Sequence, residues 1–194
     1  MTDMDNYPFN NAVSMAHMLL LPYVPQAGVL IDMTCGNGHD TAFLASLMNK
    51  DAMLYAFDIQ ACAIKATQNI LAKQNICTEH IIFCQGSHDD LVSHVDRPID
   101  IVLFNLGYLP SGDHGIHTKS EITIKAIKIC LNKIAKNGII MIAAYPGTDS
   151  GAREEQAVCK FLEQLPQKEF HSSSWRPVNQ IHYPPLLYIV QKRG

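Results

Sequence analysis

The sequence predicts an α/β fold: a mostly parallel, seven-stranded sheet with a C-terminal antiparallel hairpin strand. Short strand-type runs alternate with helix-type segments along most of the chain, which is typical of parallel strands covered by helices on both faces. The last two strand-type runs are joined only by Pro177–Pro185, a linker too short for a crossover helix. The 194 residues fit a single domain, 1–194.

The alternation can be followed from element to element. Five runs are predicted as parallel strands: Val29–Asp32, Met53–Asp58, Ile81–Cys84, Ile99–Asn105 and Gly138–Tyr145. Four segments are predicted as helices: Asp40–Met48, Ala61–Gln74, Lys119–Lys136 and Ala152–Leu165. Asn10 or Asn11 is expected to cap an earlier helix that runs to about Leu21. The hairpin strands are expected at Lys168–Arg176 and Leu186–Gln191.

Composition excludes several classes of protein. Hydrophobic residues make up 47% and charged residues 17%, which is a globular balance. No apolar run is long enough to span a bilayer and no secretion leader opens the chain, so we expect a cytoplasmic protein without membrane contact. The six cysteines are scattered without a C-x-x-C pair, which favours a reducing compartment.

The charge pattern leaves the question of RNA contact open. A net charge of −3 argues weakly against a large nucleic-acid surface. The predicted helix Lys119–Lys136 nevertheless places Lys125, Lys128 and Lys136 close to one face. This face is either solvated or an RNA-facing stripe.

A glycine-rich loop follows the first strand and carries the cofactor signal. Gly36 and Gly38 permit a tight turn and a close ligand approach, and the following helix start attracts an anion. A dinucleotide fingerprint would need glycine where Thr41 stands, so the pattern D-x-T-x-G-x-G instead favours S-adenosylmethionine (SAM). The alternative is a tight connection alone. The candidate residues of this segment are Asp32, Thr34, Gly36, Asn37, Gly38, Asp40 and Thr41.

The ends of the next two strands complete the predicted cofactor site. Asp58 stands 20 residues after Gly38, where a carboxylate can accept both ribose hydroxyls, and Gln60 follows it. Ser87 and His88 follow the third strand and are expected to border the adenine. Capping of the next helix is the alternative role for Asp58 and, after the third strand, for Ser87 or Asp89.

The fourth strand carries the signal for the reaction. It ends in Asn105 and continues as Leu-Gly-Tyr108-Leu-Pro, which resembles the N-P-P-Y loop of amino-group methyltransferases. The resemblance implies that Asn105 accepts a hydrogen bond from the target amine, beside the cofactor, and that Tyr108 stacks on a base. Candidates for the base that takes the amine proton are Asp113, His114, His117 and His182.

Two neighbouring segments bear on the same edge of the sheet. His114 and His117 form an H-x-x-H without a further ligand at useful spacing, so we expect no metal site and a substrate-facing or solvated pair. Tyr145 ends the fifth strand, and the loop 177–185 either folds over the site or is simply shaped by its prolines.

Taken in order, these motifs resemble a family of small methyltransferases labelled rRNA methylases. The resemblance covers about His17 to Lys192. It implies a Rossmann-like class I methyltransferase fold, often dimeric, and N-methylation of 5-aminomethyl(-2-thio)uridine at the wobble position of tRNA. It implies that the anticodon stem-loop is the partner. One departure is Thr148, where many relatives are expected to have histidine.

Three other functions stay open from the sequence. A methyltransferase for rRNA or for a small-molecule amine differs from the leading hypothesis in whether bulk tRNA accepts a methyl group. A non-catalytic SAM-binding protein is disfavoured by Asn105, because a pure binder has no use for an acceptor aimed at an amine. A dehydrogenase is disfavoured by Thr41.

Overall fold

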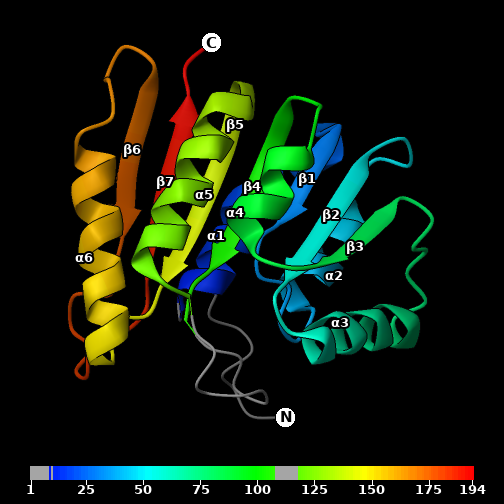
Figure 1. Cartoon of the computed structure of the whole chain (residues 1–194), viewed down its shortest axis with the longest axis horizontal. Coiled ribbons are helices and arrows are strands. Elements are labelled where there is room, and N and C mark those ends of the chain that lie inside the picture. The colour runs from blue at the N-terminus through cyan, green and yellow to red at the C-terminus, as the bar shows by residue number, and fades with distance from the viewer. Residues whose placement is uncertain (1–8, 10, 108–117) are drawn as a thin grey trace.

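The computed structural model describes residue 9, residues 11–107 and residues 118–194, and over this part a seven-stranded sheet is flanked by helices (Figure 1). The strand order is β3-β2-β1-β4-β5-β7-β6. The strands are β1 (Val29–Asp32), β2 (Met53–Asp58), β3 (Ile81–Gln85), β4 (Ile99–Asn105), β5 (Ile134–Ala144), β6 (Phe170–Trp175) and β7 (Leu186–Lys192). The helices are α1 (Ala12–Leu20), α2 (His39–Leu47), α3 (Ala61–Lys73), α4 (His88–Leu91), α5 (Ser120–Lys133) and α6 (Asp149–Glu163).

The pairing of the strands confirms the predicted sheet. The pairs among β1 to β5 are parallel, whereas β7 pairs antiparallel with β5 and with β6. The carboxyl ends of β1 to β5 therefore meet at one edge, where their arrowheads lie in Figure 1. Ligands of open α/β sheets bind at this edge.

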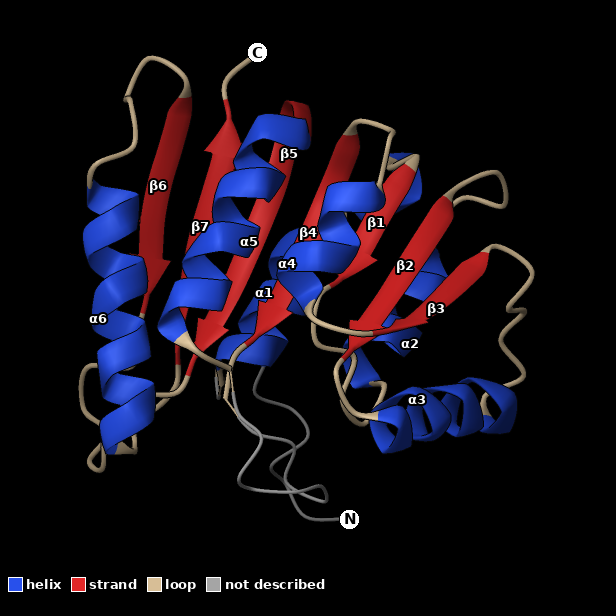
Figure 2. Ribbon diagram, in the orientation of Figure 1, coloured by secondary structure: helices blue, strands red, loops and turns tan. Residues whose placement is uncertain are grey.

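Helices lie on both faces of the sheet (Figure 2), and an apolar cluster packs on each face. On one face, Ile127 of α5 and Val158 of α6 are fully buried against strand residues such as Ile140. On the other face, Leu20 of α1 and Leu44 of α2 are fully buried in the second cluster, which also takes Leu71 of α3. Burial on both faces explains why the central strands are continuously apolar.

The boundary between α5 and β5 differs from the prediction. The helix ends at Lys133 rather than Lys136, and β5 begins at Ile134 rather than Gly138. Ile134 is buried and pairs with Ile99 of β4, so its backbone is extended. Lys136 therefore lies on a strand and does not extend the lysine face of the helix.

Other boundaries shift by a few residues. Helix α6 begins at Asp149, three residues before the predicted start, because the Thr148 hydroxyl accepts a hydrogen bond from Gly151 N at 3.1 Å. Strand β6 is shorter than predicted at its start, where it begins at Phe170. Asn11 caps α1 by accepting from Ser14 N at 2.8 Å, which decides between the two predicted caps.

All six cysteines are unpaired, in line with the predicted absence of a disulfide framework. None of the helices in the described part of the chain has both the length and the apolar character that crossing a bilayer requires.

Candidate active site

The candidate site lies where the carboxyl ends of β1 and β4 meet, at the point where the strand order reverses. Asp32 ends β1 and Asn105 ends β4. The backbone N–H of Asn105 donates to the Thr34 hydroxyl at 2.8 Å, which ties the two strand ends together. Residues that are 71 positions apart in the sequence thus form one wall of the site.

The glycine loop between β1 and α2 is a tight turn. Gly36 and Gly38 have positive φ angles of 51° and 85°, in the left-handed region that glycine favours. A Cβ at Gly38 would lie 2.7 Å from the Thr67 backbone and 2.6 Å from Ile70, so α3 packs directly on the loop. The packing of α3 therefore fixes the shape of the loop.

Asp58 at the end of β2 organises this loop. One carboxylate oxygen accepts from Gly36 N and the other accepts from Gln60 N, each at 2.9 Å. Each oxygen keeps acceptor capacity, because a carboxylate offers about four lone-pair positions. The side chain is half-buried beside the loop, which is where the sequence predicts the ribose of the cofactor.

Asp32 is fully buried and its carboxylate is occupied by protein donors. It accepts from the Thr41 hydroxyl at 2.6 Å and from Thr34 N at 3.2 Å. Burial, and next the charge of Asp40, raise the pKa of Asp32 to about 8, although these two hydrogen bonds lower it. In this structure Asp32 and Thr41 brace the loop from within.

The raised pKa of Asp32 predicts a pH-dependent stability. The folded protein holds the Asp32 proton more tightly than the unfolded chain, whose pKa is near 3.8. The stabilisation is complete below about pH 4 and is lost as the pH rises through about 8. Asp32→Asn keeps an acceptor for Thr34 and cannot ionise, so the variant should gain stability relative to wild type between these pH values. Thermal unfolding without cofactor at pH 4, 6 and 8 measures this gain, and parallel curves would contradict it.

Ser87 and His88 lie at the start of α4, and their side chains have different environments. The Ser87 hydroxyl donates to Asp89, and the Ser87 side chain makes no capping hydrogen bond to α4, in contrast to the capping alternative. His88 is buried edge-on against Phe104 of β4, and its Nε2 has no partner among the described residues. Burial lowers the pKa of His88, which therefore favours the neutral ring. The ring nitrogen Nε2 thus keeps its hydrogen-bonding capacity, although the atom itself is buried in the structure.

A chain of side chains connects α1 to the end of β4. Asp40, in the first turn of α2, lies with one carboxylate oxygen 2.7 Å from Nε2 of His17. Its other oxygen accepts from Nδ2 of Asn105 at 3.3 Å. Tyr145 follows β5 and is close enough to Asp40 and Asn105 for both side chains to affect the pKa of its phenol. Burial and the charge of Asp40 raise the pKa of Tyr145 to about 12, so this phenol stays protonated at neutral pH.

Sequence reasoning missed His17. It lies on α1, 23 residues before Asp40, and no local motif marks it. Its ring stacks on Phe43 of α2 with centroids 3.9 Å apart and planes 4° apart. Tertiary packing of α1 brings His17 to the site, and a single sequence gives no sign of such packing.

The segment after Asn105 is pinned at both of its ends. Gly107 N donates to the Thr118 hydroxyl at 2.8 Å, and Thr118 N donates to the Gly107 carbonyl at 3.0 Å. The Thr118 hydroxyl in turn donates to buried Glu154 of α6 at 2.6 Å. The predicted residues between these ends, Tyr108, Asp113, His114 and His117, lie outside the described residues.

Glu154 is the second residue near the site that the sequence did not reveal, and its contacts support the segment's end at Thr118. Its other carboxylate oxygen accepts from the Thr123 hydroxyl at 2.7 Å. Each hydrogen bond to a charged group contributes about 1.5–3 kcal/mol, so Glu154→Ala should lower the free energy of unfolding by about 3 kcal/mol. Denaturant titration measures this loss. Exposed Glu163→Ala on the same helix is the control, and an equal loss in both variants would contradict the prediction.

The loop between β6 and β7 approaches the same edge. A Cβ at Gly147 would lie 3.9 Å from the His182 carbonyl and 3.8 Å from the Tyr183 carbonyl. Both residues have positive φ angles, 63° and 51°, and both side chains are exposed. The loop is predicted either to fold over the site or to be shaped only by its prolines. Its approach to Gly147 favours a position near the site.

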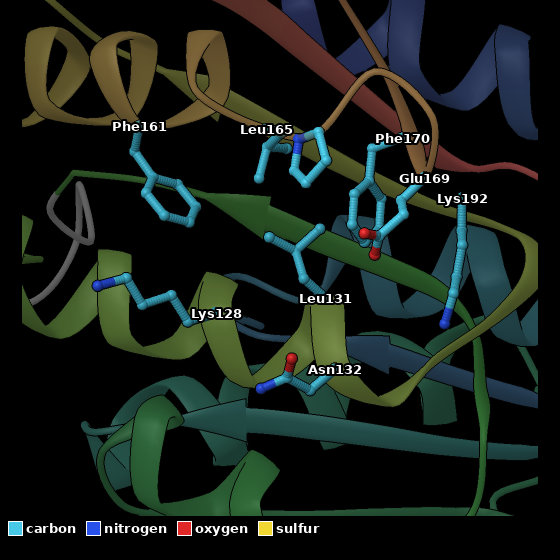
Figure 3. A pocket seen from close by; sticks show the side chains of 9 residues that line it. Lys128, Leu131, Asn132, Phe161, Leu165, Glu169, Phe170 and Lys192 are labelled. Carbon is cyan, nitrogen blue, oxygen red and sulfur yellow. The ribbon is translucent and has the colours of Figure 1, made fainter.

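The groove in Figure 3 is a separate feature. It lies between α5, α6 and the start of β6, with Leu131 and Phe170 on its floor and Lys128 and Lys192 at its rim. It contains none of the predicted site residues. Lys128 lies over the Phe161 ring, 5.5 Å from its centroid, and Lys125 pairs with Asp89 at 2.7 Å. Of the two alternatives for the α5 lysines, these local contacts favour the solvated face.

Comparisons with known proteins agree with this geometry. The family model "Putative rRNA methylase" matches residues 54–191. The chain belongs to this family. A solved structure named "putative rRNA-methylase" from Clostridium thermocellum is 37% identical, with a TM-score of 0.89 over 94% of this chain and 98% of that one. The resemblance stated from the motifs is thereby confirmed.

Two further relatives of the present chain have names that state a function. A "putative methyltransferase" from Streptococcus mutans, solved in complex with SAH, is 33% identical, with a TM-score of 0.84 over 94% of this chain and 98% of that one. A protein of Arabidopsis thaliana named tRNA (mnm(5)s(2)U34)-methyltransferase, chloroplastic, is 29% identical over 94% of this chain and 70% of its own length. The fold is that of class I SAM-dependent methyltransferases, as predicted.

Proposed function

We propose that this protein is a cytoplasmic SAM-dependent N-methyltransferase that converts 5-aminomethyl(-2-thio)uridine at the tRNA wobble position to its methylaminomethyl form. The observation that carries the proposal is the position of Asn105. Asn105 ends β4, its backbone N–H bonds Thr34 of the glycine loop, and its side-chain amide lies beside Asp40 in the first turn of α2. An amide oxygen there can accept a hydrogen bond from an amine and direct its lone pair at the cofactor methyl group.

The residues around the glycine loop fit SAM. Helix α2 starts at the loop and offers its positive end to the methionine carboxylate. Asp58 has acceptor capacity for the ribose hydroxyls, and the unpartnered Nε2 of His88 can bond the adenine. The relative from Streptococcus mutans was solved with SAH, the product of methyl transfer from SAM. SAM supplies the activated methyl group, so the protein's task is to bind and align.

The acceptor amine must lose its proton before it can attack. With a pKa of about 10, deprotonation at pH 7 costs up to about 4 kcal/mol, and burial of the amine in the site would reduce that cost. The proposed base candidates are Asp113, His114, His117 and His182. Tyr145 remains a neutral phenol and can bond the nucleobase or the acceptor.

A tRNA substrate is supported by the Arabidopsis relative and by local charge. Although the whole chain carries a net charge of −3, residues 170–194 contain no Asp or Glu. Arg176 stands at the start of the β6–β7 loop, and this loop approaches the site. A polyanion can therefore meet the site from this side without local repulsion. A homodimer would extend such a surface across a two-fold axis, which gel filtration would test.

The deciding experiment is methyl transfer from labelled SAM to total tRNA from cells that lack the final wobble methylation. Nucleoside mass analysis then identifies the product. A new methylaminomethyl uridine supports enzyme class, substrate and acceptor atom together. Because the family is described as rRNA methylases, ribosomal RNA is assayed in parallel. Transfer to ribosomal RNA alone would overturn the tRNA proposal and keep the cofactor.

A further inference from the structure

An asparagine can align an amine only when its amide faces the right way. The carbonyl oxygen Oδ1 accepts hydrogen bonds, whereas Nδ2 only donates. A half-turn about the last side-chain bond exchanges the two and presents a donor to the amine. The alignment proposed for Asn105 therefore requires something that selects one of the two orientations.

Asp40 is placed to make this selection. Its Oδ2 lies 3.3 Å from Nδ2 of Asn105, and a carboxylate can only accept. The flipped amide would set Oδ1 against a carboxylate oxygen, without a proton between them. The contact with Asp40 therefore selects the orientation in which Nδ2 faces the carboxylate and Oδ1 faces away from it.

Asp40 is itself fixed by its neighbours. It is buried in the first turn of α2, where the positive end of the helix favours a negative charge. Its Oδ1 is taken by His17 at 2.7 Å, and the His17 ring is clamped on Phe43. His17 thus occupies one oxygen and leaves the other for Asn105. The adjacent Thr41 bonds Asp32, which secures the same turn of α2 to β1.

We propose that Asp40, held by His17, is a positioning residue that fixes the Asn105 amide with its carbonyl oxygen toward the acceptor amine. The inference rests on the proposed function, because it names what aligns the acceptor in that same site. It gives Asp40 a different role from the cofactor contact that the sequence predicts, because its contacts run to His17 and Asn105.

The kinetic test uses Asp40→Asn in the full-length protein. The amide that this substitution introduces can donate as well as accept, so the Asn105 amide can adopt both orientations. We expect kcat for methyl transfer to tRNA to fall by about 10- to 100-fold, as for loss of one well-placed group, while KM for tRNA and the SAM dissociation constant stay within about threefold. An unchanged kcat overturns the inference. A rise in the SAM dissociation constant that matches the loss would also overturn it, because Asp40 would then be a cofactor contact.

Two further variants separate positioning from general structural damage. His17→Gln keeps an N–H donor and should retain most of kcat, whereas His17→Phe keeps an aromatic ring on Phe43 and should lose it. The matched control is Asp100→Asn, since the Asp100 carboxylate bonds Gly28 N at 2.8 Å and Val29 N at 2.9 Å near the opposite end of β4. Its kcat should stay within about twofold of wild type. Equal losses in the His17 variants would contradict the role of the donor.

A measurement without substrate keeps this inference distinct from the proposed function. The side-chain amide signals of Asn105 can be assigned in nitrogen-15 NMR spectra by their loss in Asn105→Ala. We expect two separate proton signals in the wild type, and shifted or exchange-broadened signals in Asp40→Asn. Unaltered signals overturn the inference even if tRNA is methylated. Altered signals support it even if the acceptor proves to be an amine in another molecule.

Discussion

Replacing Asn105 by alanine should lower kcat for methyl transfer by about 100- to 1,000-fold, the range found when one preorganised polar group of an active site is removed. The substitution deletes the amide that the proposed mechanism aims at the acceptor amine. It leaves the backbone N–H of residue 105, and therefore its bond to Thr34, in place. The two strand ends should stay joined, so we expect the SAM dissociation constant to remain within about threefold.

Single-turnover kinetics and calorimetry with SAM measure the two quantities separately. Asn132→Ala on α5 is a suitable control, because Asn132 is exposed and lines the groove that contains none of the predicted site residues. Undiminished turnover in Asn105→Ala would remove the side chain from the mechanism. A large rise in the SAM dissociation constant, with kcat retained at saturation, would make Asn105 a cofactor contact only.

The sequence predicted those parts of the site that depend on local pattern. Apolar strand-type runs located β1 to β4 to within a residue, and the spacing of Gly36, Gly38 and Thr41 separated this loop from a dinucleotide fingerprint. Each strand end then placed its polar residue at the same edge, because parallel strands share their carboxyl ends. Asp58 and Asn105 lie at that edge as expected.

What the sequence could not predict depends on contacts between distant segments. Whether residue 134 continued α5 or began β5 was decided by its pairing with Ile99, and local propensity carries no information on that partner. His17 reaches Asp40 only because α1 packs beside α2, and Glu154 reaches Thr118 across 36 residues. For the same reason the lysines of α5 were left open, since Asp89 and Phe161 become their neighbours only in the fold.

Replacing Asp58 by alanine should raise the SAM dissociation constant by about 10- to 100-fold, since each lost hydrogen bond to a charged group costs about 1.5–3 kcal/mol. Two losses add together in this variant. One is the proposed bonding of the ribose hydroxyls. The other is the support of Gly36 N and Gln60 N, which Asp58 provides in the structure. We expect kcat at saturating SAM to stay within a few-fold, because neither loss involves the acceptor amine.

A double-mutant cycle separates the two losses. An SAH analogue without the 2′- and 3′-hydroxyls cannot bond Asp58 through the ribose, so it should bind weakly to wild type. If Asp58 holds the ribose, Asp58→Ala should weaken this analogue much less than it weakens SAH. If both ligands lose the same factor, Asp58 acts through the glycine loop alone. An unaltered SAH titration in Asp58→Ala would refute both roles, because the variant removes every acceptor that the side chain offers.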